Sequence, residues 1–401
     1  MWPLEYYRRL TKKVISEPLK FPGYWRLLRF TNILSKDYPS EFLRKGLPPM
    51  TISIRITFRC QLRCIQCPEW GKEGYFRYVD SNKFSLENEL STSEWKSFLK
   101  EVASFRPFVY FTGGEPLMRE DIIELIRWAN KHHLVTSLST NALLLKEKAQ
   151  ELIDSGLDYL YISLDGPPDT NEKIRLGSSS SSEAVDAAIY FLNLRNRLKR
   201  LSPMVEIRTV IVKENEDKLF KTALFVDNNI KPEAFGLQCL HYTTQSQLKK
   251  AEPIYNKKLG INGRLYWASS VFDPSAMNTS ILEKEMEKIK KKKWHFKVHY
   301  YPPLDHPKFS WQTYFRDPED PIGFYDYCGS LYSIGVIQPN GNVVTCPCSQ
   351  DYVSGNIRKN PFLSIWRGDR HNHFREVTQR DRPATCSRCR AHFTFRKKSL
   401  G

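Results

Sequence analysis

The chain has 401 residues, of which 41% are hydrophobic and 26% charged, and this composition permits a sizeable core in two domains or in one barrel with an appendage. The formal net charge is +17, a property that concerns partners more than the fold. No window approaches the roughly 18–20 consecutive apolar residues of a membrane span, and the first residues lack the pattern of a signal peptide, so we expect a cytoplasmic protein.

The first 48 residues combine aromatic and basic side chains with several prolines. A short amphipathic helix is expected at Leu4–Ile15, and we expect this leader to cap the bottom of a barrel. Contact with a membrane surface is the alternative. The positive charge of the whole chain is explained equally by a solvated basic surface and by an anionic partner, such as a phosphorylated small molecule, an acidic electron-donor protein, nucleic acid or anionic lipid.

Residues 49–245 alternate short apolar runs with helical segments. The sequence predicts strands at 52–56, 108–111, 134–138, 159–164, 205–212 and 234–240. Helices are predicted at 93–105, 121–132, 146–154, 183–200 and 217–228. Short connections imply parallel strands, and near-continuous apolar strands suit a sheet buried on both faces. We therefore predict an α/β fold, a partial (β/α)6 TIM-like barrel, with its chemistry at the carboxyl ends of the strands.

Three cysteines, Cys60, Cys64 and Cys67, follow the first predicted strand at a C-x3-C-x2-C spacing. Thiolates are soft ligands that suit iron–sulfur clusters. Three thiolates ligate three irons of a [4Fe–4S] cube and leave the fourth iron open to a small molecule. A zinc site, or buried thiols without a metal, is the other interpretation of this spacing.

Glycine-rich and polar segments follow the next predicted strands. After the second strand, Gly113 and Gly114 let a ligand approach the backbone, and the carboxylate of Glu115 can accept hydrogen bonds from an ammonium group; a type II turn is the alternative. After the third strand, Ser139 and Asn141 suit the hydroxyl groups of a nucleoside, or an ordinary helix N-cap.

The segment after the fourth predicted strand contains Asp165 and, ten residues later, Arg175. An arginine forms bidentate contacts with a carboxylate, so Arg175 is a candidate ligand-binding residue. A solvated loop arginine is the alternative. Residues 246–327 fit no βα pattern, and we expect this variable segment to carry substrate-specific elements. Cys239, within the sixth predicted strand, is most simply a small buried hydrophobe.

Residues 328–401 hold five of the nine cysteines. Two β-prone runs flank the turn Asn340-Gly341, which predicts a hairpin in a small α+β extension. Cys348 either substitutes for Cys346 or is a spectator. Clustered cysteines in a reducing compartment favour metal ligation over disulfides, and both an iron–sulfur cluster and a zinc ribbon are compatible with them. The cysteine pattern of this region is Cys328, a hairpin that ends at Cys346, a helical stretch and a final C-x2-C pair, Cys386 and Cys389.

In their order and spacing these segments resemble the radical S-adenosylmethionine (radical SAM) superfamily over about residues 50–240, and a SPASM/twitch-type auxiliary-cluster domain over about residues 328–390. The resemblance implies one [4Fe–4S] cluster that binds SAM at Cys60, Cys64 and Cys67, and an auxiliary [4Fe–4S] cluster at the four C-terminal cysteines. It also implies that SAM is bound by Gly113, Gly114, Glu115, Ser139, Asn141, Asp165 and Arg175. Gln66 departs from the family, which usually has an aromatic residue before the last cysteine.

The resemblance implies an enzyme that cleaves SAM reductively to a 5′-deoxyadenosyl radical, which abstracts a hydrogen atom from the substrate. An auxiliary cluster closed by four thiolates favours electron transfer, and hence a net oxidation such as dehydrogenation or bond formation. We expect a small anionic or phosphorylated biosynthetic intermediate as substrate and reduced flavodoxin or ferredoxin as electron donor. A maturase that modifies a peptide or protein is the alternative, and a non-catalytic, zinc-dependent nucleic-acid-binding protein is a remote one. No general acid or base is identifiable.

Overall fold

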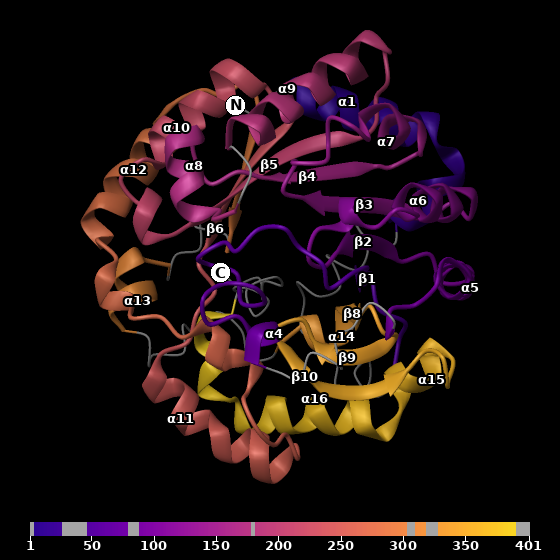
Figure 1. Cartoon of the computed structure of the whole chain (residues 1–401), viewed down its shortest axis with the longest axis vertical. Coiled ribbons are helices and arrows are strands. Elements are labelled where there is room, and N and C mark those ends of the chain that lie inside the picture. Colours follow the sequence, from indigo (N-terminus) through magenta and orange to yellow (C-terminus); the bar gives the residue numbers. More distant parts are fainter. Residues whose placement is uncertain are drawn as a thin grey trace, which may run out of the picture.

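One sheet of ten strands runs through the molecule, in the order β10-β9-β8-β1-β2-β3-β4-β5-β6-β7. The structure, a computed structural model, describes residues 4–25, 46–78, 88–177, 181–302, 309–317 and 328–389. In Figure 1 the sheet curves around the centre of the molecule, and the helices that connect its parallel strands lie on the outer, convex side.

Six consecutive parallel strands form the βα units that the sequence predicts. The strands are β1 (Thr51–Arg55), β2 (Phe108–Thr112), β3 (Val135–Thr140), β4 (Tyr159–Ser163), β5 (Met204–Ile211) and β6 (Ala234–Cys239). The helices are α5 (Thr92–Ala103), α6 (Ile122–Lys131), α7 (Ala149–Asp154), α8 (Pro168–Ile174), α9 (Ser181–Arg197) and α10 (Leu219–Phe225). The predicted α/β fold with a partial barrel is therefore confirmed, and the predicted elements differ from the observed ones mainly at their ends.

The region 246–327 contains a further parallel strand, so the prediction that it holds no βα pattern is wrong. Helix α12 (Thr279–Lys291) leads into β7 (Lys297–Tyr301), which pairs in parallel with β6. The residues of β7, Lys-Val-His-Tyr-Tyr, do not form the apolar run that marks the other strands in the sequence, and all five are partly exposed. The other α-helices described in this region are α11 (Gln245–Pro253) and α13 (Trp311–Arg316).

The C-terminal cysteine region continues the barrel sheet. Strand β8 (Ile334–Ile337) pairs in parallel with β1, and β9 (Asn342–Cys346) runs antiparallel to β8, which confirms the predicted hairpin. Gly341 has φ +83° in the turn between them. The sequence pattern does not reveal β10 (Ser349–Asn356), because register shifts interrupt its pairing with β9. The helices of this region are α14 (Ser330–Ser333), α15 (Phe362–Arg367) and α16 (Asp369–Asp381).

The two faces of the barrel strands differ in burial. Ile54, Phe111 and Ile162, which represent the face toward the outer helices, are 0% exposed and belong to one apolar core. The residues that alternate with them in β1, β2 and β4 point to the concave face and are partly exposed. The prediction of a sheet buried on both faces is thus wrong for these strands, and their concave face is accessible to solvent.

Helix α1 (Leu4–Ser16) and the turn after it pack against the amino-terminal end of the strands. Lys13 is 0% exposed and donates a hydrogen bond to Asp158 Oδ1 at 2.6 Å. Lys20 Nζ lies 2.9 Å from both carboxylate oxygens of Asp158, and the Tyr24 hydroxyl donates to Oδ1 at 3.1 Å. One buried carboxylate therefore ties the leader to the loop before β4.

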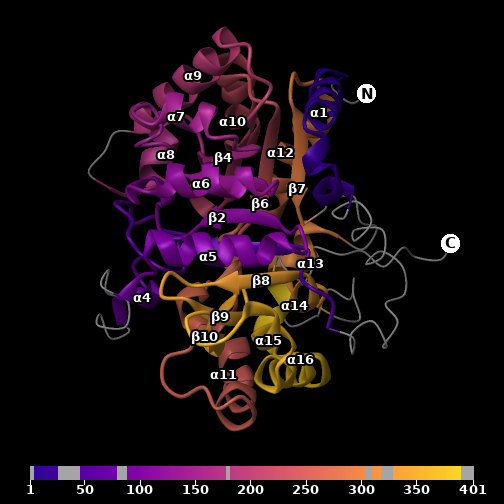
Figure 2. The same cartoon turned by 90° about the vertical axis from the view of Figure 1, so that its right-hand side faces the viewer.

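Helix α1 and α4 (Tyr75–Tyr78), the helical turn after the first three cysteines, lie at opposite sides of the molecule in Figure 2. Helix α1 therefore lies at the end of the strands away from the cysteine loop. Residues 26–45 of the leader lie outside the described residues. Among the helices that the structure describes, none combines the length and the apolarity that a membrane crossing requires.

Replacing Asp158 with Asn should remove the shared counter-charge of two buried ammonium groups. Burial alone would raise the pKa of Asp158, but Lys13 and Lys20 hold this pKa below its usual value. The stabilisation is therefore present at neutral pH, and is lost as the pH falls below about 4, the range of an unfolded aspartate. At pH 7 we expect urea unfolding of Asp158→Asn to show a loss of about 3–5 kcal/mol in the free energy of unfolding.

Asp154→Asn serves as the matched control. Asp154 pairs with Arg200, and the two side chains are 39% and 59% exposed. An exposed ion pair contributes at most about 1 kcal/mol, so this variant should unfold nearly as the wild type does. Equal losses in the two variants would contradict the role assigned to Asp158.

Candidate active site

The first three cysteines lie on a loop directly after β1, at the carboxyl end of the parallel strands. Burial raises the pKa of Cys60 to about 12 and that of Cys64 to about 11, although Arg175 acts in the opposite direction on Cys64. The pKa of Cys67 is also raised by burial, against hydrogen bonds from the backbone. Buried thiols of this kind become thiolates when a positive metal centre replaces their protons. The donor set therefore fits an iron–sulfur cluster.

Two backbone hydrogen bonds hold this loop against the segment after α8. The Arg63 amide donates to the Leu176 carbonyl at 2.6 Å, and the Ile65 amide donates to the Ile174 carbonyl at 2.9 Å. The Trp70 amide lies 3.4 Å from Cys67 Sγ and donates to it. The loop is thus fixed by the chain that follows β4, 110 residues later in the sequence.

The glycine pair after β2 lies in close contact with the start of the cysteine loop. The Gly114 amide donates to the Thr57 carbonyl at 2.9 Å, and the Glu115 amide donates to the Arg59 carbonyl at 2.6 Å. Gly113 has φ +136°, a conformation that side chains disfavour. A Cβ atom on Gly114 would lie 2.0 Å from the Arg59 carbonyl oxygen, so the contact requires glycine.

Glu115 is fully buried and joins the tips of β2 and β3. Its carboxylate accepts hydrogen bonds from the Leu117 amide at 3.0 Å, the Thr140 hydroxyl at 2.8 Å and the Asn141 amide at 2.8 Å. Burial raises its pKa to about 7, against these three hydrogen bonds. A nearby cation would restore the charged form, so this carboxylate suits an ammonium ligand.

The two other predicted residues of this edge lie on either side of the last residue of β3. Ser139 is partly exposed, on the concave face. Asn141 is buried, and its Nδ2 has no hydrogen-bond partner among the described residues. An unpaired buried donor is costly, so this amide is a candidate for a polar ligand.

Asp165 connects the cysteine loop with the strand-end residues of β4 and β5. Its Oδ2 accepts a hydrogen bond from Gln66 Nε2 at 2.7 Å and pairs with Arg175 Nε at 2.8 Å, while its Oδ1 accepts from the Val210 amide at 2.7 Å. Arg175 Nη1 lies 3.9 Å from Cys64 Sγ. Gln66, the departure from the family pattern, therefore has a structural partner in Asp165.

A second group of cysteines lies between the C-terminal extension and α11. The four expected ligands line one small cavity together with Tyr255 and Trp267. Cys348 does not line it, and its sulfur lies 3.3 Å from Cys389 Sγ. The cavity thus groups Cys346, and not Cys348, with the other three. The four lining cysteines are Cys328, Cys346, Cys386 and Cys389.

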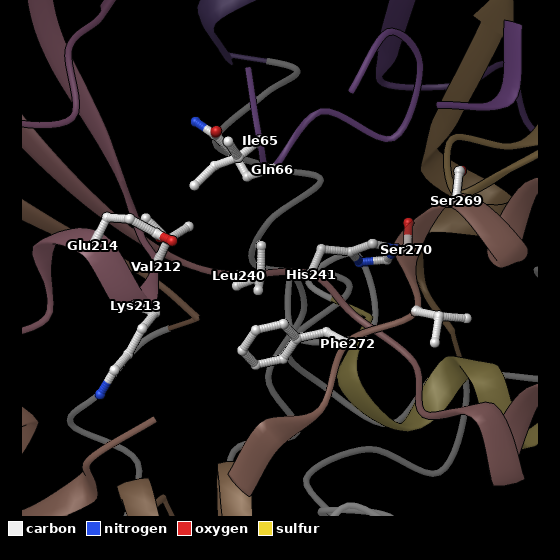
Figure 3. Close-up of a pocket in the computed structure, with 11 residues that line it drawn as sticks. Ile65, Gln66, Val212, Lys213, Glu214, Leu240, His241, Ser269, Ser270 and Phe272 are labelled. Atoms are coloured by element: carbon white, nitrogen blue, oxygen red, sulfur yellow. The ribbon is translucent and has the colours of Figure 1, made fainter. Parts of the chain in front are cut away.

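A pocket of about 240 Å³ borders the first cysteine loop and also His241, which lies near Cys348 and Cys389. Figure 3 shows Ile65 and Gln66 of the first cysteine loop across the pocket from Leu240, His241 and Phe272. The remaining lining residues are Val212, Lys213, Glu214, Ser269, Ser270 and Val271. The lining residues thus come from four segments that are far apart in the sequence, at 65–66, 212–214, 240–241 and 269–272.

His241 is a site residue that the sequence does not reveal. Its ring stacks on Trp267 with centroids 4.7 Å apart, and one of its nitrogens lies within 4.8 Å of the sulfurs of Cys348 and Cys389. A hydrogen bond with Cys348 and burial raise the pKa of Cys389 well above its usual value, while His241 acts in the opposite direction. Its only sequence signal is its position just after β6.

Comparison with known families identifies both halves of this arrangement. The family model described as "Radical SAM superfamily" matches residues 54–226, and the SPASM model, described as "Iron-sulfur cluster-binding domain", matches residues 328–390. The chain belongs to the radical SAM superfamily. It is an enzyme, and its two domains imply [4Fe–4S] clusters and SAM as cofactors. The remote alternative of a non-catalytic zinc protein does not agree with this membership.

The Fe-coproporphyrin III synthase of Methanosarcina barkeri is 27% identical over 347 residues, which cover 83% of this chain and 77% of that protein. The PqqA peptide cyclase of Rhodopseudomonas palustris is 39% identical over 123 residues, which cover 29% of each chain. The crystal structure of Streptococcus suis SuiB bound to S-adenosylmethionine matches with a TM-score of 0.55 and 17% identity, over 80% of this chain and 66% of SuiB, which shows a shared fold.

Gly114→Ala tests the backbone contact that joins the glycine pair to the cysteine loop. The added Cβ would lie 2.0 Å from the Arg59 carbonyl oxygen, and both segments would have to move apart. We expect SAM affinity, measured by isothermal titration, to fall roughly tenfold or more. Gly260→Ala is the control: its φ of +65° means that alanine strains the local backbone, but a Cβ there meets no atom within 4 Å and so pushes no other segment aside. Loss of SAM affinity in both variants would contradict the importance of the contact.

Proposed function

We propose that the protein is a radical SAM oxidoreductase that oxidises a small anionic biosynthetic intermediate. The SAM-binding cluster is held by Cys60, Cys64 and Cys67. The auxiliary cluster is held by Cys328, Cys346, Cys386 and Cys389, with Cys348 outside the ligand set. When bound, the reduced first cluster and SAM supply a radical that removes a hydrogen atom from the substrate, and the auxiliary cluster supplies an electron acceptor.

The residues at the strand ends are proposed to hold SAM in a fixed orientation. Glu115, whose pKa burial raises to about 7, accepts hydrogen bonds from the SAM ammonium group. Arg175 binds the SAM carboxylate, and Asp165 keeps its guanidinium in place. Ser139 and the unpartnered Asn141 amide bind the ribose hydroxyls. Gly113 and Gly114 bring the backbone close to the ligand.

The position of the pocket is the observation that carries the proposal of an oxidation. The pocket touches the first cysteine loop through Ile65 and Gln66, and the second group of cysteines through His241. A substrate in the pocket would therefore lie close to both groups of cysteines. Four thiolates leave no open position on the auxiliary cluster, so it accepts an electron instead of binding the substrate.

A small-molecule substrate is supported by the similarity to the Fe-coproporphyrin III synthase over most of both chains. An anionic one is supported by the net charge of +17. The alternative of a maturase with a peptide substrate is supported by the similarity to the PqqA peptide cyclase over a shorter segment, and to the mycofactocin maturase of Mycolicibacterium smegmatis over 88% of this chain and 78% of that protein. A substrate panel with both classes, assayed for stimulation of 5′-deoxyadenosine formation and for products by mass spectrometry, decides between them.

Metal analysis of anaerobically reconstituted protein tests the two ligand sets. We expect about eight iron atoms in the wild type and about four in the Cys60/Cys64/Cys67→Ala triple variant. With dithionite and SAM, only the wild type should form 5′-deoxyadenosine. About four irons in an active wild type would remove the auxiliary cluster from the proposal. Zinc in place of iron, together with no formation of 5′-deoxyadenosine, would contradict the proposed function.

His241→Leu tests the link between the pocket and the auxiliary cluster. The substitution removes the polar contact with Cys389 but keeps an apolar side chain against Trp267. We expect 5′-deoxyadenosine formation to persist, and the yield of oxidised product per 5′-deoxyadenosine to fall roughly tenfold. His373→Leu is the control, because His373 is bonded to the Lys258 carbonyl at the exposed surface. An unchanged product yield in His241→Leu would remove this residue from the electron path.

A further inference from the structure

We propose that Arg208 is the group that binds the substrate's negative charge, and that it takes a carboxylate or a phosphate. Arg208 lies on the concave face of β5, where it pairs in register with Ser163, the last residue of β4. This inference deepens the proposed function, on which it rests. It names the chemical group by which an anionic substrate is recognised.

Two contacts hold the Arg208 guanidinium in one orientation. Its Nε donates a hydrogen bond to Glu206 Oε1 at 2.8 Å, and its central carbon lies 3.4 Å from the centroid of the Tyr161 ring. The side chain is nevertheless 25% exposed. The described part of the chain offers no hydrogen-bond acceptor to Nη1 and Nη2. These two groups form a fork that matches the oxygens of a carboxylate or phosphate.

Arg208 is not the only partner of the buried Glu206 carboxylate. Its Oε2 is 2.9 Å from His299 Nδ1 on β7, which lies on the far side of β6 in the sheet. Against burial, Arg208 and His299 lower the pKa of Glu206 to about 2. Because Glu206 has a second partner, Arg208 retains the capacity to bind a further anion while Glu206 keeps it in position.

The neighbouring strand leaves room for this group. Gly236 on β6 lies opposite Arg208 in the sheet register. A Cβ atom there would lie 2.5 Å from Glu206 Oε1 and 3.4 Å from Arg208 Cγ. A larger residue at this position would displace the carboxylate that orients the guanidinium.

The position of Arg208 relative to the proposed SAM site suits a small molecule. Val210, two residues further along β5, donates its amide hydrogen to Asp165, which also contacts Gln66 of the cysteine loop. Two residues of a strand span about 7 Å. Arg208 itself does not line the pocket, but Val212, four residues further along the same chain segment, does. A substrate anchored at Arg208 would therefore extend along β5 past Asp165 to reach the pocket.

Arg208 would make the same contact with Glu206 if its role were only structural. Binding of an anion is therefore the measurement that distinguishes a binding role from a structural one. We would use reconstituted full-length protein with SAM and without reductant. The carboxylate probe is Fe-coproporphyrin III, followed by absorbance, and the phosphate probe is GTP, followed by calorimetry. The variants are Arg208→Met and Arg208→Lys, and Arg200→Met at an exposed position serves as the matched control.

The wild type is expected to bind at least one probe. Arg208→Met should weaken that binding at least about tenfold, while Arg208→Lys keeps part of it and Arg200→Met stays within about threefold. Iron content and SAM affinity should remain at the wild-type level in both Arg208 variants. These values separate loss of anion binding from loss of the fold.

Three results would overturn the inference. The wild type could bind neither probe, Arg208→Met could bind as tightly as the wild type, or both Arg208 variants could lose iron and SAM together with the probe. The last result would assign Arg208 to the architecture of the barrel. Failure of the proposed function would appear differently, as a wild type that forms no 5′-deoxyadenosine in the separate assay with reductant.

Discussion

The arrangement of the site depends on one close backbone contact between consecutive βα units. The glycine pair after β2 hydrogen-bonds to the residues between β1 and Cys60, through the Gly114 and Glu115 amides. Only glycine permits this approach, since a Cβ on Gly114 would overlap the Arg59 carbonyl. Glu115 then extends the connection to the tip of β3 through three hydrogen bonds. Hydrogen bonds therefore hold the cysteine loop, the glycines and the buried carboxylate together.

A second constraint is the pairing of β8 with β1, which makes the cysteine-rich extension part of the barrel sheet. This pairing anchors the C-terminal cysteines at the edge of the sheet that β1 would otherwise leave open. His241, two residues after the end of β6, approaches Cys389 from the other half of the sheet. The pocket is bounded on one side by the first cysteine loop and on another by His241, and this proximity favours an electron path of short steps.

The concave face of the sheet differs from the filled interior of a complete TIM barrel. Its strands present polar and aromatic side chains that are partly exposed, and Glu206, Arg208 and His299 form a connected group among them. The hydrophobic core lies on the other face of the sheet, against the helices, so these charged side chains take no part in it. They are therefore available for recognition of a ligand.

The sequence by itself determined the six βα units, the hairpin at Asn340-Gly341 and the two groups of cysteines, because strand periodicity, turn chemistry and ligand spacing are local properties of the chain. Tertiary structure alone decided the pairing of β8 with β1, the addition of β7, the choice of Cys346 over Cys348 as a cavity-lining residue, and the approach of His241 to Cys389. These features join segments that are far apart in sequence, and their residues carry no local pattern. Only the packing of the folded chain brings them together.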